Sequence, residues 1–188
     1  MQYKQKNTLN MDKKLTFWSA ALFVALYFVA VFASEFIGFI HPLCWVMAPA
    51  VGALAGAFAY VWLWRRWQGF GLGTVLAAVF GLLMLAMGEM DLARLGIVVG
   101  CGLLSDLVRL RAKSCYITYP LLALGNLAEI IYLWTLKQWY VQGAADEMGQ
   151  AYADTLAKMQ TSLWCGIAIG AILVAAVLGV YIAKRVVK

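Results

Sequence analysis

The chain has 188 residues, of which 64% are hydrophobic and 13% are charged, and its mean hydropathy is +0.81. A soluble domain of this length cannot bury so much apolar surface in one core, so a soluble globular fold is excluded and lipid is the expected solvent. The net charge of +6 lies in short basic clusters between long apolar runs, which excludes a basic nucleic-acid-binding face and indicates membrane topology.

Six apolar stretches follow one another along the chain, each close to the roughly 20 residues that cross about 30 Å of hydrocarbon. We place the spans at residues 15–37, 44–64, 71–88, 92–110, 115–137 and 161–183. Because the bilayer core holds no water to satisfy backbone groups, each crossing is expected to be helical. The first run is longer than the apolar part of a usual signal peptide, so we expect an uncleaved first span. The sequence thus predicts one all-α membrane domain of six transmembrane helices.

The basic residues predict the orientation of these spans. With the N-terminus inside, twelve of the fifteen lie on the inner side and only three outside, and the opposite orientation would reverse this ratio. The inner residues would be Lys4, Lys6, Lys13, Lys14, Arg65, Arg66, Arg109, Arg111, Lys113, Lys184, Arg185 and Lys188, and the outer ones Arg94, Lys137 and Lys158. Since inner loops carry the excess of lysine and arginine, both termini are expected in the cytoplasm.

The longest connection, residues 138–160, is expected on the outer side. Four of its apolar residues recur at helical spacing, which predicts a short amphipathic helix: Met148, Tyr152, Leu156 and Met159. This helix either covers an outward pocket or extends the sixth span, and the pattern leaves both interpretations open.

Glu129 is the most informative single residue. It lies about eight residues below the outer end of the fifth span, roughly 12 Å deep, where an ionised side chain costs several kcal/mol. Asn126 and Tyr132 lie three residues before and after it on the same helical face, and Gly125 allows a close approach. The carboxyl is either protonated or hydrogen-bonded between helices, or it belongs to a polar patch facing a binding cavity.

Further polar residues gather at the outer ends of other spans. Glu35 and His41 lie around the first outer loop, and Glu89, Asp91 and Arg94 lie in the second. Together with Glu129 they are candidates for one outward pocket, because ligand sites are concave and mostly apolar with a few convergent polar groups. Taken alone, each loop residue is more readily explained as a solvated loop side chain, and His41, which precedes Pro42, as a helix boundary.

Small residues predict close helix contacts. The second span carries Ala48, Gly52 and Gly56 on one face, and the fourth carries Gly96 and Gly100, for which packing within the bundle is expected. For Ala21 and Ala25 in the first span, contact with a partner protein is nearly as well supported as packing within the bundle.

Several enzyme motifs are missing from the sequence. The glycine-rich stretch 69–74 lacks the lysine of a nucleotide-binding loop, His41 is the sole histidine, and there is no G-x-S-x-G. The four cysteines form no C-x-x-C, so neither a disulfide framework nor a metal site is implied. We therefore expect no enzymatic activity, metal or cofactor in this chain.

The arrangement resembles the substrate-binding S components of energy-coupling factor (ECF) transporters, in particular the MptD-like, or Trep_Strep, group. The resemblance covers most of the chain and lies in the order and spacing of short segments. These are Leu15-Thr-Phe, Ala25-Leu-Tyr-Phe-Val, Pro42 to Gly56 with Pro49-Ala-Val-Gly-Ala inside it, Arg65-Arg66 with Phe70-Gly and Thr74, Met87-Gly88, Ser105-Asp-Leu-Val-Arg, and Tyr152 to Leu156.

This resemblance implies a receptor that captures a vitamin or similar micronutrient from outside. It would work with a transmembrane scaffold subunit and two cytoplasmic ATPases, so ATP would be used by the partners. The family's substrate sites correspond here to Asn126, Glu129, Tyr132, Trp164 and the loops bearing Glu89 and Arg94, and its scaffold contacts to Ala21 and Ala25. Two other functions remain open from the residues alone: a proton-coupled carrier or small channel with Glu129 as the titrating group, and a membrane scaffold that binds no ligand.

Overall fold

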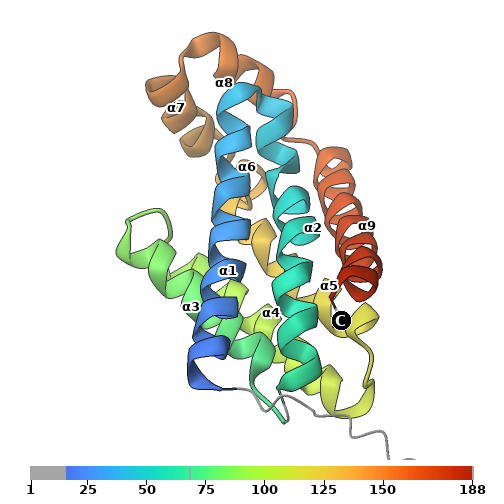
Figure 1. The fold of residues 1–188 in the computed structure, drawn as a ribbon. Helices are drawn as coiled ribbons and strands as arrows, with labels where there is room; N and C mark the ends of the chain where they lie inside the picture. Colours follow the sequence, from blue (N-terminus) through green and yellow to red (C-terminus); the bar gives the residue numbers. More distant parts are fainter. Residues whose placement is uncertain (1–15, 68, 188) are drawn as a thin grey trace, which may run out of the picture.

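The computed structural model describes residues 16–67 and 69–187, and all regular structure within those ranges is helical, as expected (Figure 1). Of the predicted inner basic residues, Lys4, Lys6, Lys13, Lys14 and Lys188 lie outside the described residues. The elements in chain order are α1 (Phe17–Glu35), the 3₁₀ helix η1 (Phe36–Ile40), α2 (Pro42–Arg66), α3 (Leu72–Ala86), α4 (Leu92–Arg111), α5 (Cys115–Ala123), the 3₁₀ helix η2 (Leu124–Glu129), α6 (Tyr132–Thr135), α7 (Lys137–Met148), α8 (Gln150–Ala157) and α9 (Ser162–Val186).

Three helical segments in the described part of the chain are long and apolar enough to cross a bilayer: Phe17–Ile40, Pro42–Arg66 and Ser162–Val186. α3 is a shorter apolar helix, and α4 interrupts its apolar run with several charged residues. α2 is the central member, because it packs along both α1 and α9 (Figure 1).

The small residues of α2 let its neighbours approach closely. Gly52 faces Val31 and Ser34 of α1, and a Cβ on Gly56 would lie 2.9 Å from the ring of Tyr27. On the other side, a Cβ on Gly179 of α9 would lie 2.8 Å from a backbone carbonyl of α2. The small-residue face of the second span therefore serves packing inside the bundle, as expected.

The predicted glycine pair of the fourth span behaves differently. Neither Gly96 nor Gly100 has any atom within 4 Å of its Cβ position, whereas Gly102 crosses the backbone of α3 at Gly73. A Cβ on Gly102 would lie 2.6 Å from the carbonyl oxygen of Gly73 and 2.5 Å from the Cβ of Ala77. The close contact of α4 is thus made by a glycine outside the predicted pair.

Gly102→Ala is expected to destabilise the protein by about 1–3 kcal/mol, because the helix backbones must separate to admit the methyl group. The matched control is Gly100→Ala on the same helix, which gains up to about 1 kcal/mol in helix propensity without a clash. Unfolding in mixed detergent micelles, followed by circular dichroism, measures both. Equal stability of the two variants would contradict the close crossing.

The fifth predicted span, 115–137, is wrong as a continuous helix. It consists of α5, the 3₁₀ turn η2 and the single turn α6. Pro120 inside α5 removes one backbone donor, and η2 then packs Gly125 against α4, with its Cβ position 3.4 Å from the Cα of Val98. Protein surrounds this irregular backbone, and η2 ends at the buried Glu129.

The connection predicted at residues 138–160 forms two helices, α7 and α8, separated by Gly149 at φ +90°. It does not extend the sixth span, because α9 starts separately after Thr161, whose side chain accepts a hydrogen bond from the backbone N–H of Trp164. Trp45 Nε1 donates to Tyr140 Oη at 2.6 Å, and Tyr152 Oη donates to a carbonyl of η1 at 2.8 Å. α7 and α8 are therefore fastened across the ends of α1 and α2 (Figure 1).

Charged residues separate to opposite ends of the bundle. Arg65, at the end of α2, donates to the carbonyls of Lys184 and Val187 at the end of α9, and Arg109 of α4 donates to the carbonyl of Trp67 at 2.6 Å. The helix ends that carry Arg65, Arg66, Arg109, Arg111, Lys184 and Arg185 therefore meet. Most acidic side chains lie at the other end, either on α7 and α8 or facing them.

Candidate functional site

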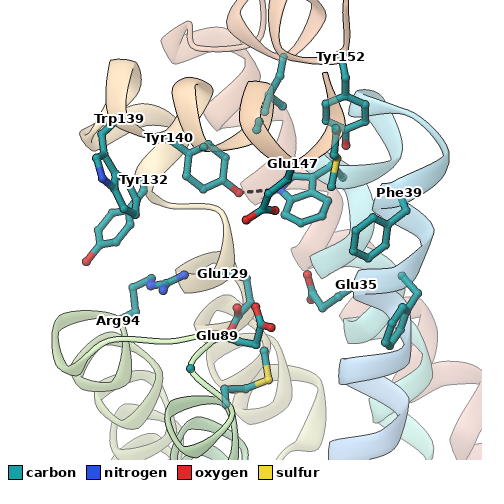
Figure 2. Close-up of a pocket in the computed structure, with 18 of the residues that line it drawn as sticks. Glu35, Phe39, Glu89, Arg94, Glu129, Tyr132, Trp139, Tyr140, Glu147 and Tyr152 are labelled. Atoms are coloured by element: carbon teal, nitrogen blue, oxygen red, sulfur yellow. Dashed lines mark hydrogen bonds between the residues drawn. The ribbon is translucent and has the colours of Figure 1, made fainter. Parts of the chain in front are cut away.

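A cavity of about 310 Å³ lies at the acidic end, between the bundle and the α7–α8 connection (Figure 2). Its walls come from α1, η1, α2, α3, the α3–α4 loop, α4, η2, α6, α7 and α8. Segments that are distant in sequence thus converge on one concave surface, which is the usual setting of a small-molecule site.

Four glutamates line this cavity: Glu35, Glu89, Glu129 and Glu147. Glu129 is only 8% exposed, and one carboxylate oxygen of Glu129 and one of Glu35 are buried without any hydrogen-bond partner in the described structure. In Figure 2 these carboxylates face a common space. A buried polar atom normally has a partner, so these two carboxylate oxygens are candidates to accept a hydrogen bond from a ligand or to carry a proton.

Arg94 also lines the cavity, but its charge is already compensated. Its Nε lies 3.2 Å from Asp91 Oδ2, and this is the sole ion pair within residues 16–67 and 69–187. Tyr132 donates to the same carboxylate oxygen at 2.6 Å and lies under the guanidinium, 5.0 Å from its carbon to the ring centre.

Asp91 is held ionised by this network. Desolvation is the largest single effect and favours its neutral form, but the hydrogen bonds from Tyr132 and from two backbone N–H groups, together with the charge of Arg94, outweigh it and lower the pKa of Asp91. The Asp91–Arg94–Tyr132 cluster therefore forms a closed unit at one rim of the cavity.

Aromatic side chains make up much of the remaining wall: Phe32, Phe36, Phe39, Trp45, Tyr132, Trp139, Tyr140 and Tyr152. Phe39 meets Trp45 edge to face at 5.8 Å, and Tyr132 meets Trp139 edge to face at 5.9 Å. Burial raises the pKa of Tyr152 to about 12, so its phenol stays protonated and donates to the carbonyl of Gly38.

The structure brings five predicted site residues to the cavity: Glu35, Glu89, Arg94, Glu129 and Tyr132. These come from four separate segments, α1, the α3–α4 loop with the start of α4, η2 and α6.

Three other predicted site residues do not line it. Asn126 is buried and donates to the carbonyl of Pro49 at 3.4 Å, so it connects η2 to α2. His41 caps α2, with its Nδ1 accepting from the backbone N–H of Leu43 at 3.1 Å. Trp164 packs at the start of α9 against a small apolar cluster that includes Val46.

Sequence reasoning missed one face of α7. Tyr140, Gly143, Ala144 and Glu147 all line the cavity, and their spacing of i, i+3, i+4 and i+7 marks one side of a helix. This periodicity is visible in the sequence and could have predicted that these four residues share one face of a helix. Tyr152 and Leu156 of the predicted amphipathic helix line the cavity as well.

The arrangement suits binding of a small molecule. Within the described residues no group of three or more histidine, cysteine, aspartate or glutamate side chains is placed to hold a metal ion. What the cavity offers is a set of carboxylate acceptors beside aromatic faces, covered by α7 and α8.

Comparison with known proteins gives one match. A family model described as "Hypothetical bacterial integral membrane protein (Trep_Strep)" matches residues 17–188. No curated protein and no solved structure matches the chain.

Proposed function

We propose that this chain, which belongs to the Trep_Strep family of hypothetical bacterial integral membrane proteins, is the substrate-binding membrane subunit of an ECF-type importer. The match over residues 17–188 confirms the predicted membership of the Trep_Strep family. The proposed activity is capture of a vitamin or other micronutrient from outside the cell and its delivery inward with an ATP-hydrolysing module. ATP would be consumed by two partner ATPases, held through a transmembrane scaffold subunit.

The cavity at the acidic end is the observation that carries this proposal. It combines a broken membrane segment, two unpartnered buried carboxylates and a helical cover in one place. Broken helices at membrane depth supply polar groups to a bound solute, which a continuous helix cannot do as readily. Glu129 would neutralise or polarise the substrate, Tyr132 would orient it, and the aromatic side chains would cover its apolar part.

The same proposal includes six membrane crossings with both termini inside. The three long apolar helices would span with α3, α4 and the broken α5–η2–α6 segment. The gathering of basic helix ends opposite the cavity supports this orientation, because inner segments carry the excess of lysine and arginine. The cavity would then open toward the outside of the cytoplasmic membrane. Labelling tests this orientation: a cysteine introduced at Gln142 is expected to react with an impermeant maleimide that is added from the outside.

The exposed side of α1 supports a protein partner. Ala21 and Ala25 are exposed, as are Leu22 at 57% and Val29 at 56%. Small residues between larger apolar ones let another helix approach closely in lipid. This face is the proposed contact with the scaffold subunit.

Co-purification and transport test the proposed function. The tagged chain, extracted from its native membrane in mild detergent, is expected to bring down ATP-hydrolysing partners, and substrate uptake into vesicles is expected to require both those partners and ATP. If the chain alone in proteoliposomes accumulates substrate when a pH gradient is applied, the importer proposal fails.

That second result would favour a proton-coupled carrier, for which the unpartnered oxygens of Glu35 and Glu129 are the specific support. Intramembrane carboxyls often relay protons. In that case Glu129→Gln would abolish the response to the pH gradient while Asp146→Asn would keep it.

A further inference from the structure

We propose that the ligand of the α7–α8-covered cavity is an organic cation, a small molecule in which an ammonium or cationic nitrogen heterocycle is attached to an apolar or aromatic body. This inference rests on the proposed binding function of the cavity and specifies the chemical class of its substrate.

The charge of the cavity wall is the first argument. Four glutamates line it, and the single lining arginine, Arg94, is paired with Asp91. No described cation lies within 4 Å of any of the four glutamate carboxylates. The lining charges that are not in an ion pair are therefore all negative, and a concave site of this kind favours a ligand of the opposite sign.

The unpartnered oxygens give the second argument. Glu129 Oε1 and Glu35 Oε1 are buried, have no hydrogen-bond partner among the described residues, and belong to side chains on opposite walls of the cavity (Figure 2). A positively charged N–H donor or a quaternary nitrogen between them would supply the compensation that buried carboxylates require. A neutral donor could form a hydrogen bond with one of these oxygens but would leave the carboxylate charges uncompensated, and an anionic ligand would be repelled by them.

The aromatic wall is the third argument, and it separates an organic cation from a bare metal ion. Phe36, Phe39, Trp45 and Tyr152 occupy the η1, α2 and α8 side of the cavity. Aromatic faces attract cations through their quadrupole and also bury apolar surface. With about 310 Å³, the cavity has room for a small organic molecule.

The test is thermal stability of the full chain in lipid nanodiscs against compounds sorted by charge. The cationic probes are thiamine, choline and spermidine, the neutral ones riboflavin, nicotinamide and pyridoxine, and the anionic ones biotin, pantothenate and folate. Choline is also compared with 3,3-dimethylbutanol, which has the same shape without the charge. Stabilisation is expected from cationic compounds alone, since a ligand raises Tm by binding the folded state.

Matched variants locate the contact. Glu129→Gln is expected to raise Kd for the stabilising cation about 30-fold or more, as removing one partner of a desolvated charge pair does. Glu35→Gln provides a second test on the opposite wall. On α7, Glu147→Gln is expected to weaken binding, while its exposed neighbour Asp146→Asn, which does not line the cavity, leaves Kd unchanged.

The outcomes separate the two levels of the proposal. A tight neutral or anionic ligand, or a cation that binds Glu129→Gln and Glu35→Gln unchanged, would overturn the cation assignment and leave the binding function standing. If no compound of any charge class raises Tm, that result would count against the binding function itself, and the cation assignment would be overturned as well.

Discussion

Replacing Asp106 by alanine is expected to lower the free energy of unfolding by about 3 kcal/mol or more. Asp106 belongs to α4 and is 1% exposed, and its carboxylate caps the start of α3. It accepts from the backbone N–H of Gly73 at 2.9 Å, from the backbone N–H of Thr74 at 2.8 Å and from the Thr74 hydroxyl at 2.7 Å. Alanine would leave these donors buried without an acceptor at a helix N-terminus, where negative charge is also favoured.

Equilibrium unfolding in mixed micelles, followed by tryptophan fluorescence, measures this loss. The control is Asp154→Ala on α8, an exposed carboxylate that accepts one hydrogen bond from Gln150 at 2.7 Å, for which a change within about 0.5 kcal/mol is expected. Asp106→Asn should fall between alanine and the natural residue, since its amide nitrogen cannot accept. If Asp106→Ala and the Asp154→Ala control have the same free energy of unfolding, the Asp106 cap does not stabilise the protein.

Gly143→Trp is expected to abolish ligand binding while leaving the protein folded. Gly143 lies on the cavity face of α7, and a Cβ built on it meets no atom within 4 Å. A large side chain at this position can therefore extend into the cavity without displacing α7, and it would occupy the volume that the ligand needs. The ligand-induced rise in Tm is the measurement, with the ligand-free Tm as the check on folding.

The control for this experiment is Gln142→Trp, one residue earlier, which is exposed and does not line the cavity. It adds the same indole to the same helix but on another side, so binding should persist. Full binding by Gly143→Trp would place the ligand site somewhere other than below α7.

Hydropathy along the chain was enough to predict an all-helical membrane protein, and three of the six predicted spans correspond to long apolar helices in the described structure. Those features depend on the local density of apolar residues, which reports the surrounding solvent and needs no knowledge of neighbours. Glu129 could be singled out in the same way, because a carboxylate within an apolar run is costly wherever that run packs. The separation of basic from acidic ends also follows from the order of charges between spans.

What only the tertiary structure decided is which side chains meet. Gly125 packs against Val98, and this contact together with Pro120 breaks the fifth predicted span into α5, η2 and α6. Hydropathy does not predict such a break, because it counts only apolar residues. Asn126, which lies on the same predicted helical face as Glu129, instead connects η2 to Pro49.

Other placements depend on contacts between distant segments. Glu147 reaches the cavity because hydrogen bonds from Trp45 and Tyr152 hold α7 and α8 over the bundle. Asp106 becomes a cap because α4 crosses the start of α3 at Gly73 and Gly102. Periodicity assigns a residue to a face of its own helix, whereas packing among all the helices decides which other helix that face contacts. For this reason the sequence alone indicated that the chain is surrounded by lipid, and only the tertiary structure decided which side chains line the cavity.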